Sequence, residues 1–132
     1  MLADTHDFDM KTMSRILAVD DDKDILEALQ LVLEDYGYEV NTLADGHRLF
    51  EVINAEHPDL ILMDIMLNGL DGRDLCKNVK LNDKTHGIPV IMISASHNVG
   101  DVLKQECAPD DFLAKPFDIN VLINKIQRQL AA

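Results

Sequence analysis

Basic residues are scarce in this chain. Its 132 residues include 12 Lys and Arg against 24 Asp and Glu, which gives a formal net charge of −12. Proteins that bind nucleic acid or an anionic membrane surface present basic patches to phosphate groups. We therefore expect no direct nucleic-acid contact and no membrane contact, and we expect the partner to be a cation or another protein.

Long apolar runs and paired cysteines are missing too. No apolar run approaches the roughly 20 residues that a membrane-spanning helix needs. Cys76 and Cys107 stand alone, without the spacing of a metal site. Because thiols that form neither disulfides nor metal sites are typical of a reducing compartment, we expect a cytoplasmic protein.

The apolar residues that are present suffice for one domain. Hydrophobic residues make up 47% of the chain, and a chain of this length can bury a substantial core. Residues 1–14 are polar and show no periodicity. We expect a frayed extension there, followed by a single domain over residues 15–132.

Short apolar segments alternate with amphipathic ones along this domain. Buried strands are predicted at 15–19, 39–43, 60–63, 89–93 and 111–114. Apolar residues at helical spacing predict helices at 25–36, after 46, from 71, at 100–108 and from 119. This alternation predicts an α/β fold, (βα)₅, in which helices cover both faces of a doubly wound parallel sheet of five strands. The acidic pair Asp110-Asp111 fits a solvated turn.

Charged and polar side chains stand where these strands end. The apolar stretch 60–63 runs straight into Asp64, and a loop with two glycines follows. Asp20 and Asp21 come after the first strand, Ser94 after the fourth and Lys115 after the fifth. Ligands of open parallel sheets bind beyond the carboxyl ends of the strands. If the first strand lies between the second and the third, all these side chains share one small site.

Three carboxylates in one site need a cation. Like charges a few ångströms apart repel one another, and burial raises the cost. Lys115 offsets one charge and leaves about −2, which suits a hard divalent ion with oxygen ligands, so we expect Mg²⁺. With that metal held by Asp20 and Asp21, Asp64 can act as a nucleophile toward phosphorus. Lys115 and the Ser94 hydroxyl can bind the phosphoryl oxygens.

Four motifs in this order resemble the receiver domain of two-component response regulators, chemotaxis receivers among them. They are Ile16-Leu17-Ala18-Val19-Asp20-Asp21-Asp22, Leu62-Met63-Asp64 with Gly72 eight residues further on, Ser94-Ala95, and Phe112 before Lys115-Pro116-Phe117. The match runs from Arg15 to about Leu130. The resemblance implies a flavodoxin-like sheet with strand order 2-1-3-4-5 and a cis Lys115–Pro116 peptide.

The resemblance also implies roles for the site residues. Asp64 would take a phosphoryl group from a phosphohistidine on a sensor histidine kinase or a histidine phosphotransfer protein. Asp20, Asp21 and Asp64 would hold Mg²⁺ together with the backbone carbonyl of Met66. Ser94 and Phe112 would switch, the hydroxyl moving toward the phosphoryl group and the ring rotating inward, so that contacts with a downstream protein target change. Such a protein is a stoichiometric phosphoacceptor that assists its own phosphorylation and dephosphorylation, not an enzyme.

Asn68 is one departure from the family pattern, and several interpretations of the chain stay open. Asn68 stands where the family usually has Pro, so we expect a looser loop after Asp64. Asp20-x-Asp22 loosely fits the nucleophile motif of a Mg²⁺-dependent phosphohydrolase of the haloacid-dehalogenase type, although Asp24 and the position of the acidic pair before Lys115 count against it. A second alternative is an interaction module that works without phosphorylation. The domain could be free-standing, a phosphorelay intermediate or a piece of a larger protein.

Overall fold

The computed structural model describes residues 13–94 and 109–131. Five parallel strands form one sheet in the order β2-β1-β3-β6-β7. Their bounds are β1 Arg15–Val19, β2 Glu39–Leu43, β3 Leu60–Asp64, β6 Val90–Ser94 and β7 Asp111–Ala114. Counting these parallel strands alone, the order is the expected 2-1-3-4-5. The predicted strand at 89–93 is observed one residue later.

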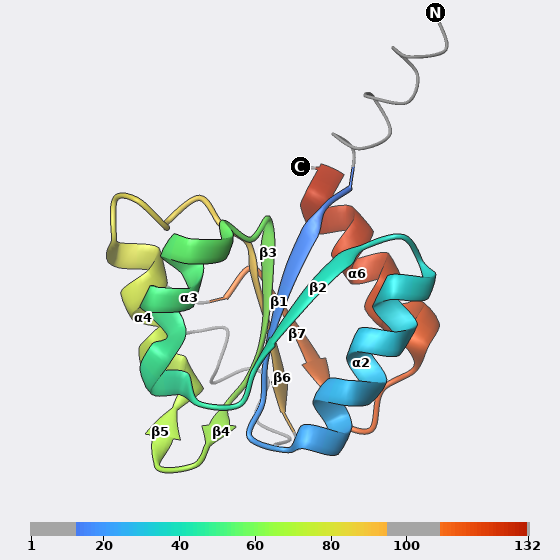
Figure 1. Cartoon of the computed structure of the whole chain (residues 1–132), viewed down its shortest axis with the longest axis horizontal. Coiled ribbons are helices and arrows are strands. Elements are labelled where there is room, and N and C mark those ends of the chain that lie inside the picture. Colours follow the sequence, from blue (N-terminus) through green and yellow to red (C-terminus); the bar gives the residue numbers. More distant parts are fainter. Residues whose placement is uncertain (1–12, 95–108, 132) are drawn as a thin grey trace, which may run out of the picture.

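Helices cover both faces of this sheet. They are α2 Lys23–Asp35, the 3₁₀ turn η1 Gly46–Arg48, α3 Leu49–Glu56, α4 Gly72–Leu81 and α6 Ile119–Ala131. In Figure 1, α3 and α4 lie on one side of the sheet and α2 and α6 on the other. The helix expected at 100–108 falls outside the described residues. Within the described ranges, no helix has both the length and the apolar character needed to cross a bilayer.

Alternate side chains along the strands pack into two separate hydrophobic cores, one on each face of the sheet. Leu17, Met63 and Met92 point into the core under α3 and α4. Their neighbours Ala18 and Leu62 point into the core under α2 and α6. All five residues of β3 are buried, as expected for a central strand covered on both faces. The polar ends of the strands are therefore the part of the sheet left to form a site.

The segment after Asp64 is a hairpin, which the sequence analysis missed. Strands β4 Met66–Leu67 and β5 Leu70–Asp71 pair antiparallel. The two residues between them, Asn68 and Gly69, have positive φ angles of 45° and 91°. Positive φ at both central positions is the geometry of a type I′ turn, and Asn-Gly is its preferred sequence. The loop that we expected forms a paired hairpin, because Asn tolerates a backbone angle that Pro at this position could not adopt. Its greater mobility stays a prediction.

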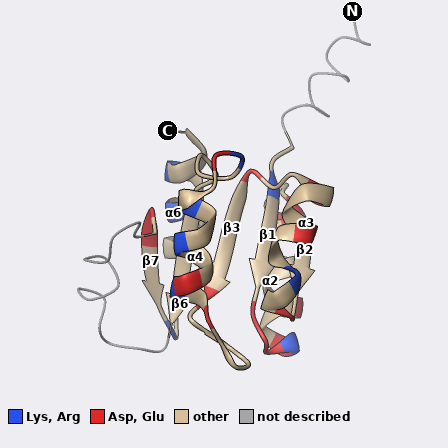
Figure 2. Cartoon of the chain, turned by 90° about the vertical axis from the view of Figure 1, so that its left-hand side faces the viewer, with Lys and Arg blue, Asp and Glu red and all other residues tan. Residues whose placement is uncertain are grey.

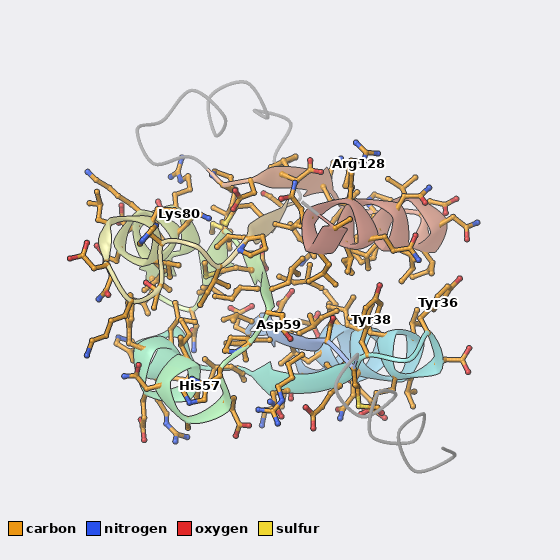
Figure 3. The ribbon with its side chains drawn as sticks, turned by 90° about the horizontal axis from the view of Figure 1, so that it is seen from above. Tyr36, Tyr38, His57, Asp59, Lys80 and Arg128 are labelled. Carbon is orange, nitrogen blue, oxygen red and sulfur yellow. The ribbon has the colours of Figure 1, made fainter. Side chains whose placement is uncertain are left out.

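The acidic pair Asp110-Asp111 is not the solvated turn that we expected. Asp110 pairs with Lys80 near the end of α4, and its Oδ2 accepts the Val90 N–H over 2.8 Å. Asp111 Oδ1 accepts a hydrogen bond of 2.9 Å from Lys125 Nζ on α6. Lys80 and Asp110 line one pocket together with Asp59, the residue just before β3, and Figure 3 labels Lys80 and Asp59 in the view from above. Asp64 is at the other end of β3. The pair therefore ties the start of β7 to β6 and to two helices, which the spacing of the sequence did not reveal.

Candidate functional site

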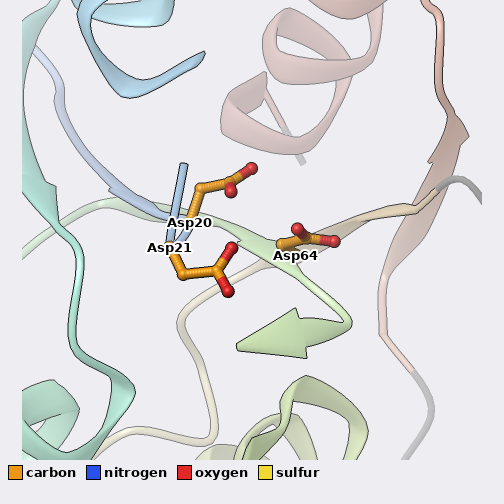
Figure 4. A group of neighbouring side chains, drawn as sticks. All are labelled: Asp20, Asp21 and Asp64. Atoms are coloured by element: carbon orange, nitrogen blue, oxygen red, sulfur yellow. The ribbon is translucent and has the colours of Figure 1, made fainter. Parts of the chain in front are cut away.

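Three carboxylates meet where β1 and β3 end. Asp20 and Asp21 follow β1, and Asp64 is the last residue of the neighbouring strand β3. One oxygen from each carboxylate lies within 4.8 Å of the other two. Figure 4 shows the three side chains gathered around one space, and Figure 2 shows acidic segments at these strand ends. The predicted juxtaposition of Asp20, Asp21 and Asp64 is present.

Asp20 is the most buried member of this cluster. It is 3% exposed, and both its oxygens are engaged. Oδ1 accepts the backbone N–H of Asp22 over 2.9 Å, and Oδ2 accepts from Lys115 Nζ over 3.0 Å. Burial raises the pKa of Asp20 above its ordinary value, and the two hydrogen bonds offset only part of this. The carboxylate is therefore held in one orientation at an electrostatic cost that a cation would relieve.

Asp64 has a similar environment at the end of the middle strand. It is 8% exposed, and its Oδ2 accepts a hydrogen bond of 3.2 Å from Lys115 Nζ. Its Oδ1 accepts a long hydrogen bond, 3.4 Å, from the backbone N–H of Met66. The weak bond to Oδ1 leaves that oxygen available to a stronger partner.

Lys115 joins the last strand to the first and the third. Its ammonium donates to both Asp20 and Asp64, and its backbone N–H donates to the Ser94 carbonyl over 2.8 Å. Burial alone would lower the pKa of Lys115, but the bonds to Asp20 and the charge of Asp64 outweigh burial and raise it. Lys115 therefore stays positively charged at neutral pH. The Lys115–Pro116 peptide is cis, as expected.

The remaining predicted residues lie around this cluster. Ser94 is buried at the end of β6, next to the end of β7. Phe112 is only 6% exposed and belongs to the core under α3 and α4, so the ring already occupies an inward position. Met66 lies two residues after Asp64 with its side chain exposed. The switching of Ser94 and Phe112 stays a prediction.

Asp22, by contrast, belongs to a helix end. Its side chain caps α2, because its Oδ1 accepts the backbone N–H of Asp24 over 2.9 Å and that of Ile25 over 3.4 Å. A carboxylate at the N-terminus of a helix is a favourable cap. Among the described residues, the group of carboxylates close enough to share a metal contains Asp21 and omits Asp22.

The donor set fits a hard divalent cation. Three carboxylates and one ammonium leave a net charge of about −2, and carboxylate oxygens are the ligands that Mg²⁺ takes from proteins. Asp21 is exposed, so one side of the cluster stays open to water and phosphate oxygens. The residues that could hold the metal are Asp20, Asp21 and Asp64.

The sequence analysis did not identify Gly72 as a residue that shapes the site. Gly72, the first residue of α4, lies against the backbone of Asp64 and Ile65, and its N–H donates to the Ile65 carbonyl over 2.7 Å. In the sequence Gly72 appeared only as a member of a motif. The Asn-Gly turn signal before it could have revealed the hairpin that leads the chain back to Asp64.

A doubly wound parallel sheet with this strand order defines an α/β protein of the flavodoxin-like class, and the acidic cluster lies at its switch point. The chain belongs to the response regulator receiver domain family, whose model matches residues 16–127. It is 41% identical to the transcriptional regulatory protein CseB of Streptomyces coelicolor over 122 residues, which are 92% of this chain and 51% of that protein. The chain therefore spans about half the length of the curated relatives it matches.

Solved structures agree with this assignment. A Chloroflexus aurantiacus protein described as a response regulator matches with a TM-score of 0.84 and 34% identity, over 92% of this chain and 100% of that one. The chemotaxis response regulator CheY4 of Vibrio cholerae matches with a TM-score of 0.80 and 30% identity, over 89% of this chain and 99% of that one. The chain is thus a receiver domain of two-component signalling, with the flavodoxin-like fold that we expected.

Proposed function

We propose that Asp64 is the phosphoacceptor of this receiver domain. A phosphohistidine on a sensor histidine kinase or a histidine phosphotransfer protein would be the donor. The observation that carries the proposal is the position of Lys115, whose ammonium bridges Asp20 and Asp64 while three carboxylates lie within 4.8 Å of one another. Lys115 gives the buried Asp64 carboxylate a fixed positive neighbour, and a divalent cation on the three carboxylates would remove the remaining repulsion toward an anionic phosphoryl group.

The residues divide the work of the transfer. An oxygen of Asp64 attacks phosphorus, the phosphorus–nitrogen bond of the phosphohistidine breaks, and the imidazole leaves with the electron pair and takes up a proton. Lys115, whose Nζ lies 3.2 Å from Asp64 Oδ2, would bind one of the new phosphoryl oxygens, and Ser94 would donate its hydroxyl to another. Asp20, Asp21 and Asp64, with the Met66 carbonyl, would hold Mg²⁺, which neutralises charge on the equatorial oxygens when it is bound.

The phosphorylated state would be read by a protein partner. A phosphoryl group adds about −1.5 to −2 charge beside Ser94 and Lys115 and so favours the packing in which both contact it. Phe112, on the same strand as the segment leading to Lys115, would carry that change toward a downstream target. We propose that this domain acts in the cytoplasm as a stoichiometric phosphoacceptor rather than an enzyme, without binding nucleic acid or membrane itself.

Incubation with a small phosphodonor tests this proposal directly. With phosphoramidate and Mg²⁺, intact mass spectrometry should find one added phosphoryl group on the wild type and none on Asp64→Asn. Asp59→Asn is the matched control, because Asp59 precedes the same strand at its other end (Figure 3). A wild type that gains no phosphoryl group, or an Asp64→Asn variant that gains as much as wild type, would overturn the proposal.

The same experiment separates the receiver from a phosphohydrolase. A hydrolase of the haloacid-dehalogenase type would use Asp20 as nucleophile and Asp22 as its acid, but the Asp22 carboxylate caps α2. Turnover of a phosphomonoester by Asp64→Asn, lost in Asp20→Asn, would favour the hydrolase. An unphosphorylated wild type that still binds its target would favour the interaction module.

A further inference from the structure

Helix α4 begins directly against the peptide that carries Asp64. The N–H of Gly72 donates to the Ile65 carbonyl over 2.7 Å. A β-carbon built on Gly72 would overlap the Asp64 carbonyl oxygen, and it would lie 3.0 Å from both the Asp64 carbonyl carbon and the Ile65 Cα. All these neighbours are backbone atoms, so no side-chain rotation can make room for a methyl group.

The backbone on the other side of this contact is also held. Asp64 pairs with Ile93 across β6, and the Ile65 N–H donates to the Ile93 carbonyl over 3.3 Å. The hairpin pairs Met66 with Asp71, the residue just before Gly72. The segment from Asp64 to Met66 therefore lies between the sheet and the first turn of α4, with hydrogen bonds on both sides.

We propose that Gly72 is a positioning residue for the phosphoacceptor and metal site. The inference rests on the function proposed above. A β-carbon at Gly72 has to push the Asp64–Ile65 peptide or lift α4, and Met66 N–H is bonded to Asp64 Oδ1. Displacement of this backbone therefore moves the carboxylate of Asp64 and the carbonyl of Met66 relative to Asp20 and Asp21. The absence of a side chain at Gly72 therefore keeps the Asp64 carboxylate and the Met66 carbonyl in position beside Asp20 and Asp21.

Three glycines provide a graded test, because each Gly→Ala change adds the same methyl group in a different setting. At Gly87 nothing lies within 4 Å of the new methyl group. At Gly46 its three nearest neighbours would be the ends of the Leu75, Leu70 and Leu67 side chains, at 3.0, 3.1 and 3.4 Å. At Gly72 it meets backbone. Comparison of Gly46→Ala with Gly72→Ala therefore distinguishes the effect of crowding movable side chains from the effect of displacing the backbone at the site.

The measurements are the Mg²⁺ dissociation constant by calorimetry, the rate of phosphorylation by phosphoramidate, and the unfolding midpoint in denaturant. In the folded Gly72→Ala variant we expect Mg²⁺ binding weaker by about tenfold to a hundredfold, the range seen when a group supporting metal ligands is lost. Gly87→Ala should match wild type, and Gly46→Ala should lose stability but not Mg²⁺ affinity. Wild-type Mg²⁺ affinity and phosphorylation in folded Gly72→Ala would overturn the inference.

A measurement on the wild type covers the case in which Gly72→Ala does not fold. In an amide NMR spectrum, titration with Mg²⁺ should shift the Gly72 N–H signal together with those of Ile65 and Met66, and leave Gly87 in place. If Ile65 and Met66 shift and Gly72 does not, Gly72 has no part in positioning. If the wild type neither binds Mg²⁺ nor takes a phosphoryl group, the proposed function fails first, whatever the variants do.

Discussion

Lys115 Nζ lies 3.2 Å from Asp64 Oδ2, so a fixed cation from the last strand already faces the carboxylate that closes the middle strand. The same ammonium lies 3.0 Å from Asp20 Oδ2. Lys115 thus lowers the repulsion between two buried carboxylates, but it also occupies oxygens that a metal would use. Lys115 would therefore act in two opposite ways: it would weaken metal binding at these carboxylates, and it would assist phosphoryl transfer to Asp64.

Replacing Lys115 with an uncharged residue should separate its effect on metal binding from its effect on phosphoryl transfer. In Lys115→Met we expect Mg²⁺ to bind about tenfold more tightly, because the metal no longer competes with an ammonium and relieves a larger repulsion. Phosphorylation by phosphoramidate should nevertheless slow, since one partner of the phosphoryl oxygens is gone. Calorimetry and intact mass measure the two effects. Lys125→Met is the control, because Lys125 also pairs with an aspartate, Asp111, which lies outside the carboxylate cluster. Weaker Mg²⁺ binding in Lys115→Met would contradict this account.

The N-cap of α4 should make stability depend on pH. The Arg73 side chain hydrogen-bonds to Asp71 and lowers the pKa of that carboxyl below its ordinary value. A lowered pKa stabilises the fold above the unfolded-state value of about 3.9, and this contribution disappears as pH falls through the lower folded value. Asp71→Asn keeps an oxygen to cap the Arg73 N–H but removes the charge.

Denaturant unfolding of wild type and Asp71→Asn from pH 7 down to acid therefore tests this pair. We expect wild type to be more stable at neutral pH and the difference to shrink as pH drops below about 4. A difference that stays constant with pH would mean that the Asp71–Arg73 pair contributes nothing through its charge.

The type I′ turn after the site should depend on its glycine. Gly69 has a φ of 91° and no atom within 4 Å of a built β-carbon, so Gly69→Ala adds backbone strain without a clash. A residue with a β-carbon in this region costs about 1–2 kcal/mol of stability. The free energy of unfolding should fall by that amount in Gly69→Ala and hardly change in Gly87→Ala. Equal stability of the two variants would show that the turn is not held in this geometry.

Asp110 should matter more than a surface acid. Its carboxylate accepts the Val90 N–H and pairs with Lys80, whose side chain is 13% exposed. Asp110→Ala leaves both donors without this acceptor, which should cost about 1–3 kcal/mol in the free energy of unfolding. Asp110→Asn keeps an oxygen for Val90 and should lose less. If both variants unfold like wild type, Asp110 is the solvated residue that the sequence suggested.

Local sequence signals determined most of the architecture. Buried strands show as short apolar runs, and four of the five lead into a polar residue that the structure places at one edge of the sheet, as with Leu60–Asp64. Parallel pairing puts all carboxyl ends at the same edge, so Asp20, Asp21, Asp64, Ser94 and Lys115 could be placed at one edge from the sequence, and into one site once the strand order was given. The order of the strands was carried over from the family, because no local pattern states which strand lies beside which.

Only the tertiary structure decided the contacts between groups distant in sequence. Three contacts depend on how strands and helices pack: Lys115 bridges Asp20 and Asp64, Asp110 binds Val90 of β6 and Lys80 of α4, and Gly72 lies against the Asp64 peptide. Charge and hydropathy identify an ionisable residue but not its partner, since a partner is set by three-dimensional distance. A glycine's missing side chain likewise has meaning only once its neighbour is known. The sequence by itself determined which groups reach the site, and the fold determined which of them touch.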